Sequence, residues 1–169
     1  MKPKLILIRG PAGSGKSTLA PLVAKKIKEK TVVIPKDPIM CRFSFFNLNE
    51  NLKSDEVLNV LTEAYLKKKV NIVIESVFGG KNSKKRIDKF KQLAKKNKAE
   101  FYLINIDVDL KTCIARDNKR DKKISKKQVS KVHAYHYLQP AKDGFILNNN
   151  CISKSKAVNE IVKYIRVGR

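Results

Sequence analysis

Residues 5–18 read Leu-Ile-Leu-Ile-Arg-Gly-Pro-Ala-Gly-Ser-Gly-Lys-Ser-Thr and contain the pattern GxxxxGK[ST]. The apolar run Leu5–Ile8 precedes the pattern and a segment of helical character follows it, which is the context that a phosphate-binding loop requires. Glycines let such a loop fold into a nest of inward-pointing N–H groups, and the helix that opens near Lys16 adds its positive end. We therefore predict a nucleotide phosphate site; a glycine-rich turn without phosphate is the less favoured interpretation.

The predicted phosphate site comprises Gly10, Pro11, Ala12, Gly13, Ser14, Gly15, Lys16, Ser17 and Thr18. In loops of this type the lysine, here Lys16, reaches the β- and γ-phosphates, and the hydroxyl of Ser17 is a ligand for Mg²⁺. ATP and Mg²⁺ are therefore the expected cofactors. The motif alone does not distinguish a motor, a switch or a kinase.

Apolar runs and amphipathic segments alternate along the rest of the chain. The four further strand candidates are Thr31–Ile34, Asn71–Glu75, Phe101–Asp107 and Phe145–Asn148. Short apolar runs of this kind suit strands that are buried on both faces. Helices are predicted from Lys16 to about Lys30, from Ser54, from about Asn82 to Lys98 and from Ser155. Such alternation predicts a single three-layer α/β domain over residues 1–169, built on a parallel sheet with right-handed crossovers.

Apolar spacing also predicts which face of each helix is buried. The expected inward positions are Val57, Leu61, Ala64 and Tyr65 in one helix, Ile87, Phe90 and Ala94 in the next, and Val158, Ile161, Val162 and Ile165 in the last.

Residues 109–139 break the alternation because they contain two helical segments in succession. Asp109 is a predicted N-cap for the first helix, and Ser125-Lys-Lys-Gln128 is a predicted capping box for the second. A basic helical hairpin placed before the last strand is typical of a lid over an active site, and connections of this kind often carry function.

Two carboxylates occupy positions suited to phosphoryl transfer. Asp37 follows the second strand candidate at its carboxyl end, where ligands of parallel sheets bind, and is the candidate general base. Its alternative role is to cap or turn a loop between Pro35 and Pro38. Glu75 ends the third strand candidate, where a carboxylate can hold the Mg²⁺ shell or contact the acceptor; it could also simply pair with a lysine.

Arg116 and Arg120 are four residues apart, so a helix through both would present them on one face. Two guanidinium groups on one face suit the oxygens of nucleotide phosphates. The alternative is a solvated basic face beside Asp117 and Asp121. His133 and His136, in the second helix, are expected to be surface or packing residues rather than metal ligands.

The composition adds a strong charge bias. The chain carries 38 Lys and Arg against 15 Asp and Glu, a formal net charge of +23, and residues 81–98 hold nine basic residues. Such a field attracts phosphate polymers without sequence preference, although a compositional bias would give the same number. The cysteines at 41, 113 and 151 form no CxxC pair, and no apolar run is long enough to span a membrane, which favours a reducing cytoplasm.

In chain order, these features resemble the P-loop kinases grouped with polynucleotide 5′-hydroxyl kinase, with zeta toxins and chloramphenicol phosphotransferase as more distant relatives. The resemblance spans nearly the whole chain and includes the lid sequence Arg116-Asp-Asn-Lys-Arg120. It implies a sheet of order 2-3-1-4-5, Asp37 as the general base, Arg116 and Arg120 as a clamp on the donor, and the adenine near residues 148–153.

The departures from this family concern the acceptor. Polynucleotide kinases carry an acceptor-phosphate arginine three residues after the base, where this chain has Met40, with Arg42 nearby but out of register. Glu75 stands where the family usually has aspartate.

Three hypotheses follow. The first is an ATP-dependent kinase that phosphorylates a 5′-hydroxyl polynucleotide or a nucleotide-like acceptor. The second is a kinase for a sugar, a nucleoside or an antibiotic. The third is a nucleotide-dependent nucleic-acid-binding protein with little transfer activity.

Overall fold

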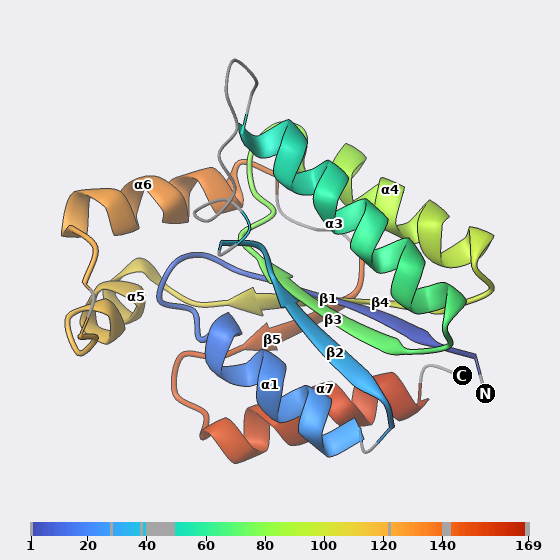
Figure 1. Ribbon diagram of the computed structural model, residues 1–169. Coiled ribbons are helices and arrows are strands. Elements are labelled where there is room, and N and C mark those ends of the chain that lie inside the picture. Colours follow the sequence, from blue (N-terminus) through green and yellow to red (C-terminus); the bar gives the residue numbers. More distant parts are fainter. Residues whose placement is uncertain are drawn as a thin grey trace.

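One parallel sheet organises the chain. The computed structural model describes residues 2–27, 29–37, 39, 50–121, 123–139 and 143–167. The strands are β1 (Lys4–Arg9), β2 (Thr31–Pro35), β3 (Asn71–Ser76), β4 (Glu100–Asp107) and β5 (Phe145–Asn148). They pair in parallel in the order β2-β3-β1-β4-β5 (Figure 1), which confirms the predicted sheet and its strand order.

Helices cover both faces of the sheet. They are α1 (Lys16–Ile27), α3 (Glu50–Lys67), α4 (Ser83–Lys96), α5 (Leu110–Asp117), α6 (Lys126–Tyr137) and α7 (Lys154–Val167). Helices α1 and α7 pack on one face and α3 and α4 on the other, whereas α5 and α6 lie beyond the carboxyl ends of the strands (Figure 1). The described parts of the chain contain no helix that combines the length and apolar character needed to cross a membrane.

The central strand β1 contributes side chains to two separate hydrophobic cores, because successive side chains of a strand point to opposite faces. Leu5 and Leu7 pack beneath α3 and α4. Ile6 and Ile8 pack against α1 and α7. All four are 0% exposed, which explains why the strand reads as an uninterrupted apolar run rather than an alternating one.

The predicted inward faces of α4 and α7 are confirmed. That of α3 is right in part, because three of its four residues pack against the core while the most buried stripe lies one position along. In α3 the buried residues are Ser54, Leu58, Thr62 and Leu66, whereas Ala64 is exposed. Val57, Leu61 and Tyr65 lie along the margin of the contact. The helix carries two adjacent apolar stripes, and contact with the sheet selects the one that contains Leu58 and Leu66.

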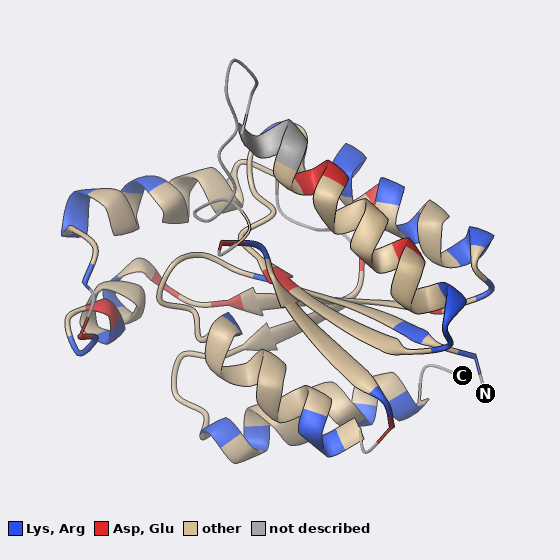
Figure 2. Ribbon diagram, viewed as in Figure 1, with Lys and Arg blue, Asp and Glu red and all other residues tan. Residues whose placement is uncertain are grey.

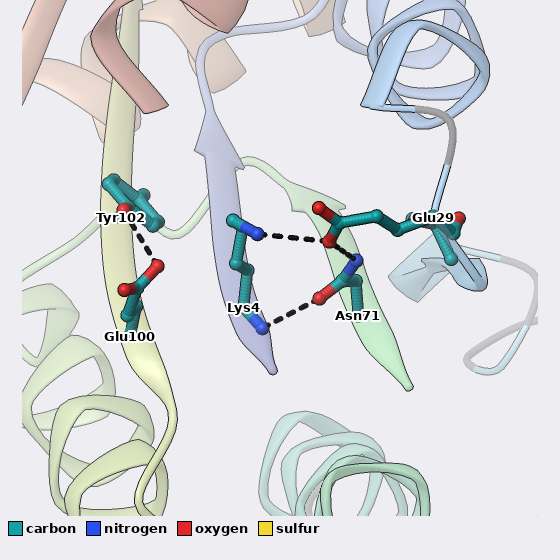
Figure 3. Close-up of polar contacts among 6 residues, drawn as sticks. Lys4, Glu29, Asn71, Glu100 and Tyr102 are labelled. Carbon is teal, nitrogen blue, oxygen red and sulfur yellow. Dashed lines mark hydrogen bonds and ion pairs between the residues drawn. The ribbon is translucent and has the colours of Figure 1, made fainter. Parts of the chain in front are cut away.

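A polar cluster joins the amino ends of the strands, opposite the phosphate loop (Figure 3). Lys4 Nζ lies 2.9 Å from Glu29 Oε2, and the same oxygen accepts a hydrogen bond of 2.8 Å from Asn71 Nδ2. Asn71 Oδ1 in turn accepts the backbone N–H of Lys4. This cluster ties β1 to β3 and to the turn after α1, and it takes no part in the site described below.

Candidate active site

The phosphate loop connects β1 to α1 at the carboxyl edge of the sheet, where ligands of parallel α/β proteins bind. Gly13 and Gly15 have φ values of +78° and +95°, which side-chain-bearing residues rarely adopt. The N–H of Ser14 donates to the carbonyl of Pro11 over 3.2 Å, and that of Leu19 donates to the carbonyl of Gly15 over 2.9 Å. The loop therefore turns tightly and leads directly into α1.

The loop also contacts the first lid helix closely. A Cβ atom at Gly13 would lie 2.5 Å from the carbonyl oxygen of Cys113 in α5. Burial raises the pKa of the Cys113 thiol to about 11, so this thiol is protonated at neutral pH and acts as a packing group.

Lys16 and Glu75 form the charged centre of the site. Lys16 is 7% exposed, and its Nζ donates to the carbonyl of Pro11 over 2.9 Å, which uses one of its three donors. Burial lowers the pKa of Lys16, and the carboxylates of Glu75 and Asp37 oppose that shift. Burial raises the pKa of Glu75, against the effect of Lys16. Each group therefore partly offsets the cost of burying the other.

Ser17 brings a hydroxyl to the same carboxylate. Its Oγ donates to Glu75 Oε1 over 3.2 Å. The pair forms because β1 and β3 are neighbours in register, with Ile8 opposite Glu75, so the carboxyl end of β3 faces the start of α1. A hydroxyl and a carboxylate are the hard oxygen donors that Mg²⁺ prefers, so these residues fit the predicted metal.

Asp37 lies two residues beyond β2, and its side chain is exposed. Its charge raises the pKa of both Lys16 and Glu75, although burial has the larger effect on each of these groups. The predicted base is thus electrostatically coupled to the phosphate loop. Four residues named above from the sequence lie outside the described residues: Pro38, Met40, Cys41 and Arg42.

Arg116 points to the loop after β5. Its Nη2 donates to the carbonyl oxygens of Asn149 and Asn150 over 2.6 and 3.1 Å, and its buried Nη1 has no partner in the described part of the chain. Asn149 Nδ2 donates to the carbonyl of Ser14 over 2.8 Å. Arg116 is therefore joined through Asn149 to the phosphate loop.

Arg120 does not share a helix face with Arg116, so that prediction is wrong. Helix α5 ends at Asp117, which is 1% exposed and whose Oδ2 accepts the backbone N–H of Ile124 over 3.0 Å. This bond turns the chain after the helix, and Arg120 lies in the turn, 3.7 Å from Asp117 Oδ1. Burial is the main cause of the lowered pKa of Lys16, and the carboxylates of Glu75 and Asp37 oppose it. The positive charge of Arg120 adds a smaller lowering.

The two predicted lid helices and their caps are present, but α6 is attached to the core. Asp109 Oδ1 accepts the N–H of Thr112, and Ser125 Oγ accepts the N–H of Gln128. Near the other end of α6, Tyr137 donates to Asp107 Oδ1 over 2.6 Å.

His136 and Arg9 complete this attachment of α6. His136, which is 4% exposed, bonds the carbonyl of Val77 over 3.0 Å, and Arg9 Nη2 lies 3.3 Å from the carbonyls of His136 and Gln139. Burial lowers the pKa of His136 to about 4, so this histidine is a neutral packing residue.

A family model described as an AAA domain matches residues 5–138, more than half of the chain. The chain belongs to this AAA domain family. The matched segment begins in β1 and ends just after α6, so it contains the phosphate loop, Asp37, Glu75 and both lid helices. A comparison with curated protein sequences finds no match.

Solved structures show the same kinase-like P-loop fold over almost the whole AAA domain chain. The APS kinase CysC of Mycobacterium tuberculosis, in complex with AMPPNP and APS, is 16% identical with a TM-score of 0.74, and the match covers 98% of each chain. Kti12 of Chaetomium thermophilum, in complex with ADP-AlF3, is 13% identical with a TM-score of 0.73 and covers 96% of this chain and 97% of its own.

A third solved structure is the Pnkp1/Rnl/Hen1 RNA repair complex. It is 20% identical over 89% of this chain and 49% of that one, with a TM-score of 0.65. At these identities the likeness shows the fold of the AAA domain protein alone.

Several residues of this AAA domain site have no signal in the sequence that identifies their role. Arg9 brings no motif of its own. Asn149 lies in the stretch 148–153 that the family resemblance assigns to the adenine, but its bond to the phosphate loop depends on β1 and β5 ending at the same edge of the sheet. The same holds for an ion-pair cluster near Asp37, formed by Lys36, Asp55 and Arg86. The sequence shows Arg86 within the basic stretch 81–98, but it gives no sign that Arg86 forms an ion pair with Asp55.

Replacing Glu75 with glutamine should stabilise the free protein at neutral pH. The folded-state pKa of Glu75 is raised above its ordinary value of 4.5 by burial, so the native state binds the proton more tightly than the unfolded chain. Wild-type stability therefore falls as pH rises through the window that begins near 4.5, and Glu75→Gln removes that loss. Urea unfolding at pH 4 and pH 7.5 should show near-equal stabilities at pH 4 and a more stable variant at pH 7.5.

Glu56→Gln, at an exposed position of α3, is the matched control and should leave the pH dependence unchanged. A Glu75→Gln protein that is less stable than the wild type at pH 7.5 would contradict the assignment of burial as the dominant effect.

Proposed function

We propose that this protein is an ATP-dependent phosphotransferase with a hydroxyl group as acceptor, and that the acceptor is a 5′-hydroxyl polynucleotide or a nucleotide-like molecule. The observation that carries the proposal is the convergence of the buried Lys16, the Ser17–Glu75 oxygen pair and Asp37 around one phosphate loop. These are the three kinds of group that in-line transfer needs: a cation for the migrating phosphoryl, oxygen ligands for a metal, and a base.

The proposed reaction is a single in-line displacement. The acceptor oxygen attacks the γ-phosphorus, its proton passes to Asp37, and the bond from the γ-phosphorus to the β–γ bridging oxygen breaks, which releases ADP. Lys16 stabilises charge on the phosphoryl oxygens, and Arg120 in the lid turn adds a second positive charge. Ser17 and Glu75 would hold Mg²⁺, which neutralises charge on the β- and γ-phosphates.

The basic surface favours a polyanionic acceptor. All eight lysines between residues 81 and 98 are exposed, and those on α4 follow one another along a helix of the outer layer (Figure 2). The ammonium groups of such a surface bind phosphates through their charge alone. The likeness to the Pnkp1-containing RNA repair complex agrees with this choice of acceptor class.

A small-molecule acceptor is the second candidate. Its specific support is the match to APS kinase, which extends over 98% of both chains. On this alternative the lysines reflect composition and take no part in the reaction. The third candidate is a nucleotide-dependent binding protein with little transfer, and the likeness to Kti12 in complex with ADP-AlF3 supports the nucleotide site that this candidate shares with the other two.

Incubation with γ-labelled ATP and a panel of 5′-hydroxyl oligonucleotides, nucleosides and sugars tests the proposal. We expect label in the oligonucleotides, and we expect kcat/KM for them to fall about 10²-fold between about 50 and 200 mM salt if about five phosphates are contacted. Labelling of a small molecule with little dependence on salt would support the second candidate. Tight binding of ATP and RNA without labelling of any hydroxyl would support the third.

A further inference from the structure

Three charged side chains form a cluster beside the proposed base. Lys36 Nζ lies 2.8 Å from Asp55 Oδ1, and Arg86 holds the same carboxylate through Nε (2.6 Å to Oδ2) and Nη2 (3.0 Å to Oδ1). These residues come from the end of β2, from α3 and from the first turns of α4, and the strand order brings them together at the carboxyl edge of the sheet.

The cluster has an excess of positive charge. Two cations share one carboxylate, and the side chains of Lys36, Asp55 and Arg86 are only 2, 16 and 16% exposed. Burial, together with a smaller repulsion from Arg86, lowers the pKa of Lys36 against the effect of Asp55. Arg9 is a further cation close to this cluster. Burial is the main cause that lowers the pKa of Arg9 to about 10, and the charge of Arg86 adds to that lowering. The carboxylate of Asp37 also raises the pKa of Lys36, so with Arg9 included three cations face two carboxylates. An uncompensated cation in partial burial is costly, and a further anion would offset that cost.

Arg86 has donors left for such an anion. Nε and Nη2 are used by Asp55, and Nη1 has no hydrogen bond to any atom of the described residues. The guanidinium is also held in place, since its central carbon lies 5.2 Å from the centroid of the Phe78 ring. Phe78 adopts a φ of +41°, a conformation that is strained for a residue with a side chain and that is typical of functional sites.

The cluster lies on the acceptor side of the phosphate loop. Lys36 is the neighbour of Asp37 in the chain, and Asp37 is coupled in charge both to Lys36 and to Lys16. An acceptor whose hydroxyl contacts Asp37 would thus carry its other groups toward Arg86.

We propose that Arg86, supported by Lys36, binds a phosphate or similar oxyanion of the acceptor close to the hydroxyl that is phosphorylated. The acceptor is then itself an anion, and uncharged nucleosides and sugars are poor substrates. This inference rests on the proposed phosphotransferase function and narrows its substrate class. The oxyanion could come from the phosphodiester of a polynucleotide or from a mononucleotide, because both present the same chemistry to a guanidinium.

The first test is binding of inorganic phosphate, measured by titration calorimetry with AMPPNP saturating the phosphate loop. Arg86→Gln should weaken phosphate binding by about tenfold or more, the usual effect of losing a charge-assisted hydrogen bond. Lys163→Gln removes a positive charge from an exposed position of α7, outside the basic stretch 81–98, and should change the affinity less than twofold. Equal weakening by both variants would overturn the proposal, because it would indicate general attraction to the basic surface.

A second variant separates binding from a purely structural role. Asp55→Asn removes the carboxylate that competes for Arg86, so it should strengthen phosphate binding even where it lowers thermal stability. A structural ion pair predicts the opposite pattern, with lower stability and unchanged or weaker phosphate binding. Unchanged affinity in Asp55→Asn together with unchanged affinity in Arg86→Gln overturns the proposal whether or not the protein transfers phosphate.

Transfer assays then identify the source of the anion. A 5′-hydroxyl oligonucleotide, a nucleoside 3′-monophosphate and the uncharged nucleoside form the three arms. Arg86→Gln should raise KM at least tenfold for the charged acceptors and leave KM for ATP unchanged. Activity on the oligonucleotide alone points to the phosphodiester, and equal activity on the monophosphate points to the mononucleotide. A wild-type preference for the uncharged nucleoside overturns the anion subsite while leaving phosphotransfer intact, whereas absence of transfer in every arm overturns the proposed function alone.

Discussion

Lys16→Ala should reduce phosphoryl transfer about 10³-fold or more while leaving the protein folded. The ammonium group is buried against the phosphate loop, where a charge acts on the migrating phosphoryl without competition from water. Without Lys16 the carboxylate of Glu75 loses the cation that partly offsets its burial, so a modest loss of stability without unfolding is expected in the free protein. Initial rates with γ-labelled ATP measure the first effect.

Thermal unfolding measures whether ATP still binds. A nucleotide present at 100 times its Kd stabilises the wild type by about 2.7 kcal/mol, and this gain should largely disappear in Lys16→Ala. Lys25→Ala, at an exposed position near the end of α1, is the matched control and should retain both activity and stabilisation. If Lys16→Ala keeps more than a tenth of the wild-type rate, the phosphate loop is not the catalytic site.

Asp37→Asn should lower kcat by about 10²–10⁴-fold, the range for loss of a general base, and leave ATP binding intact. Asparagine has the same shape but accepts no proton. Asp37 is exposed at the carboxyl edge beside Lys16 and Glu75, so the substitution creates no cavity and should change stability by less than about 0.5 kcal/mol. Steady-state kinetics and the shift of the unfolding midpoint by ATP distinguish the two effects.

Asp88→Asn on α4 makes the same chemical change away from the phosphate loop, so its kinetics should match those of the wild type. A fully active Asp37→Asn enzyme would show that another group takes the acceptor proton.

Much of the fold was predictable because its signals are local. Each strand was identified from a run of four to seven residues, and the N-caps Asp109 and Ser125 followed from hydrogen bonds that span only three residues. The sheet order 2-3-1-4-5 came from the family resemblance rather than from the runs themselves. Errors appeared where the outcome depended on packing: the buried stripe of α3, and the end of α5, which the distant contact of Asp117 with Ile124 determines.

The sequence by itself determined the phosphate loop, because the glycines, Lys16 and Ser17 act within one turn of chain and their chemistry follows from their spacing. It also placed Asp37 and Glu75 at strand ends, where a parallel sheet collects ligands. Only the tertiary structure decided how groups from different strands meet. The Ser17–Glu75 bond needs β1 and β3 as neighbours, and the Lys36–Asp55–Arg86 cluster needs three separate elements to end at one edge. Such contacts depend on the three-dimensional register of distant segments, which no local pattern of residues records.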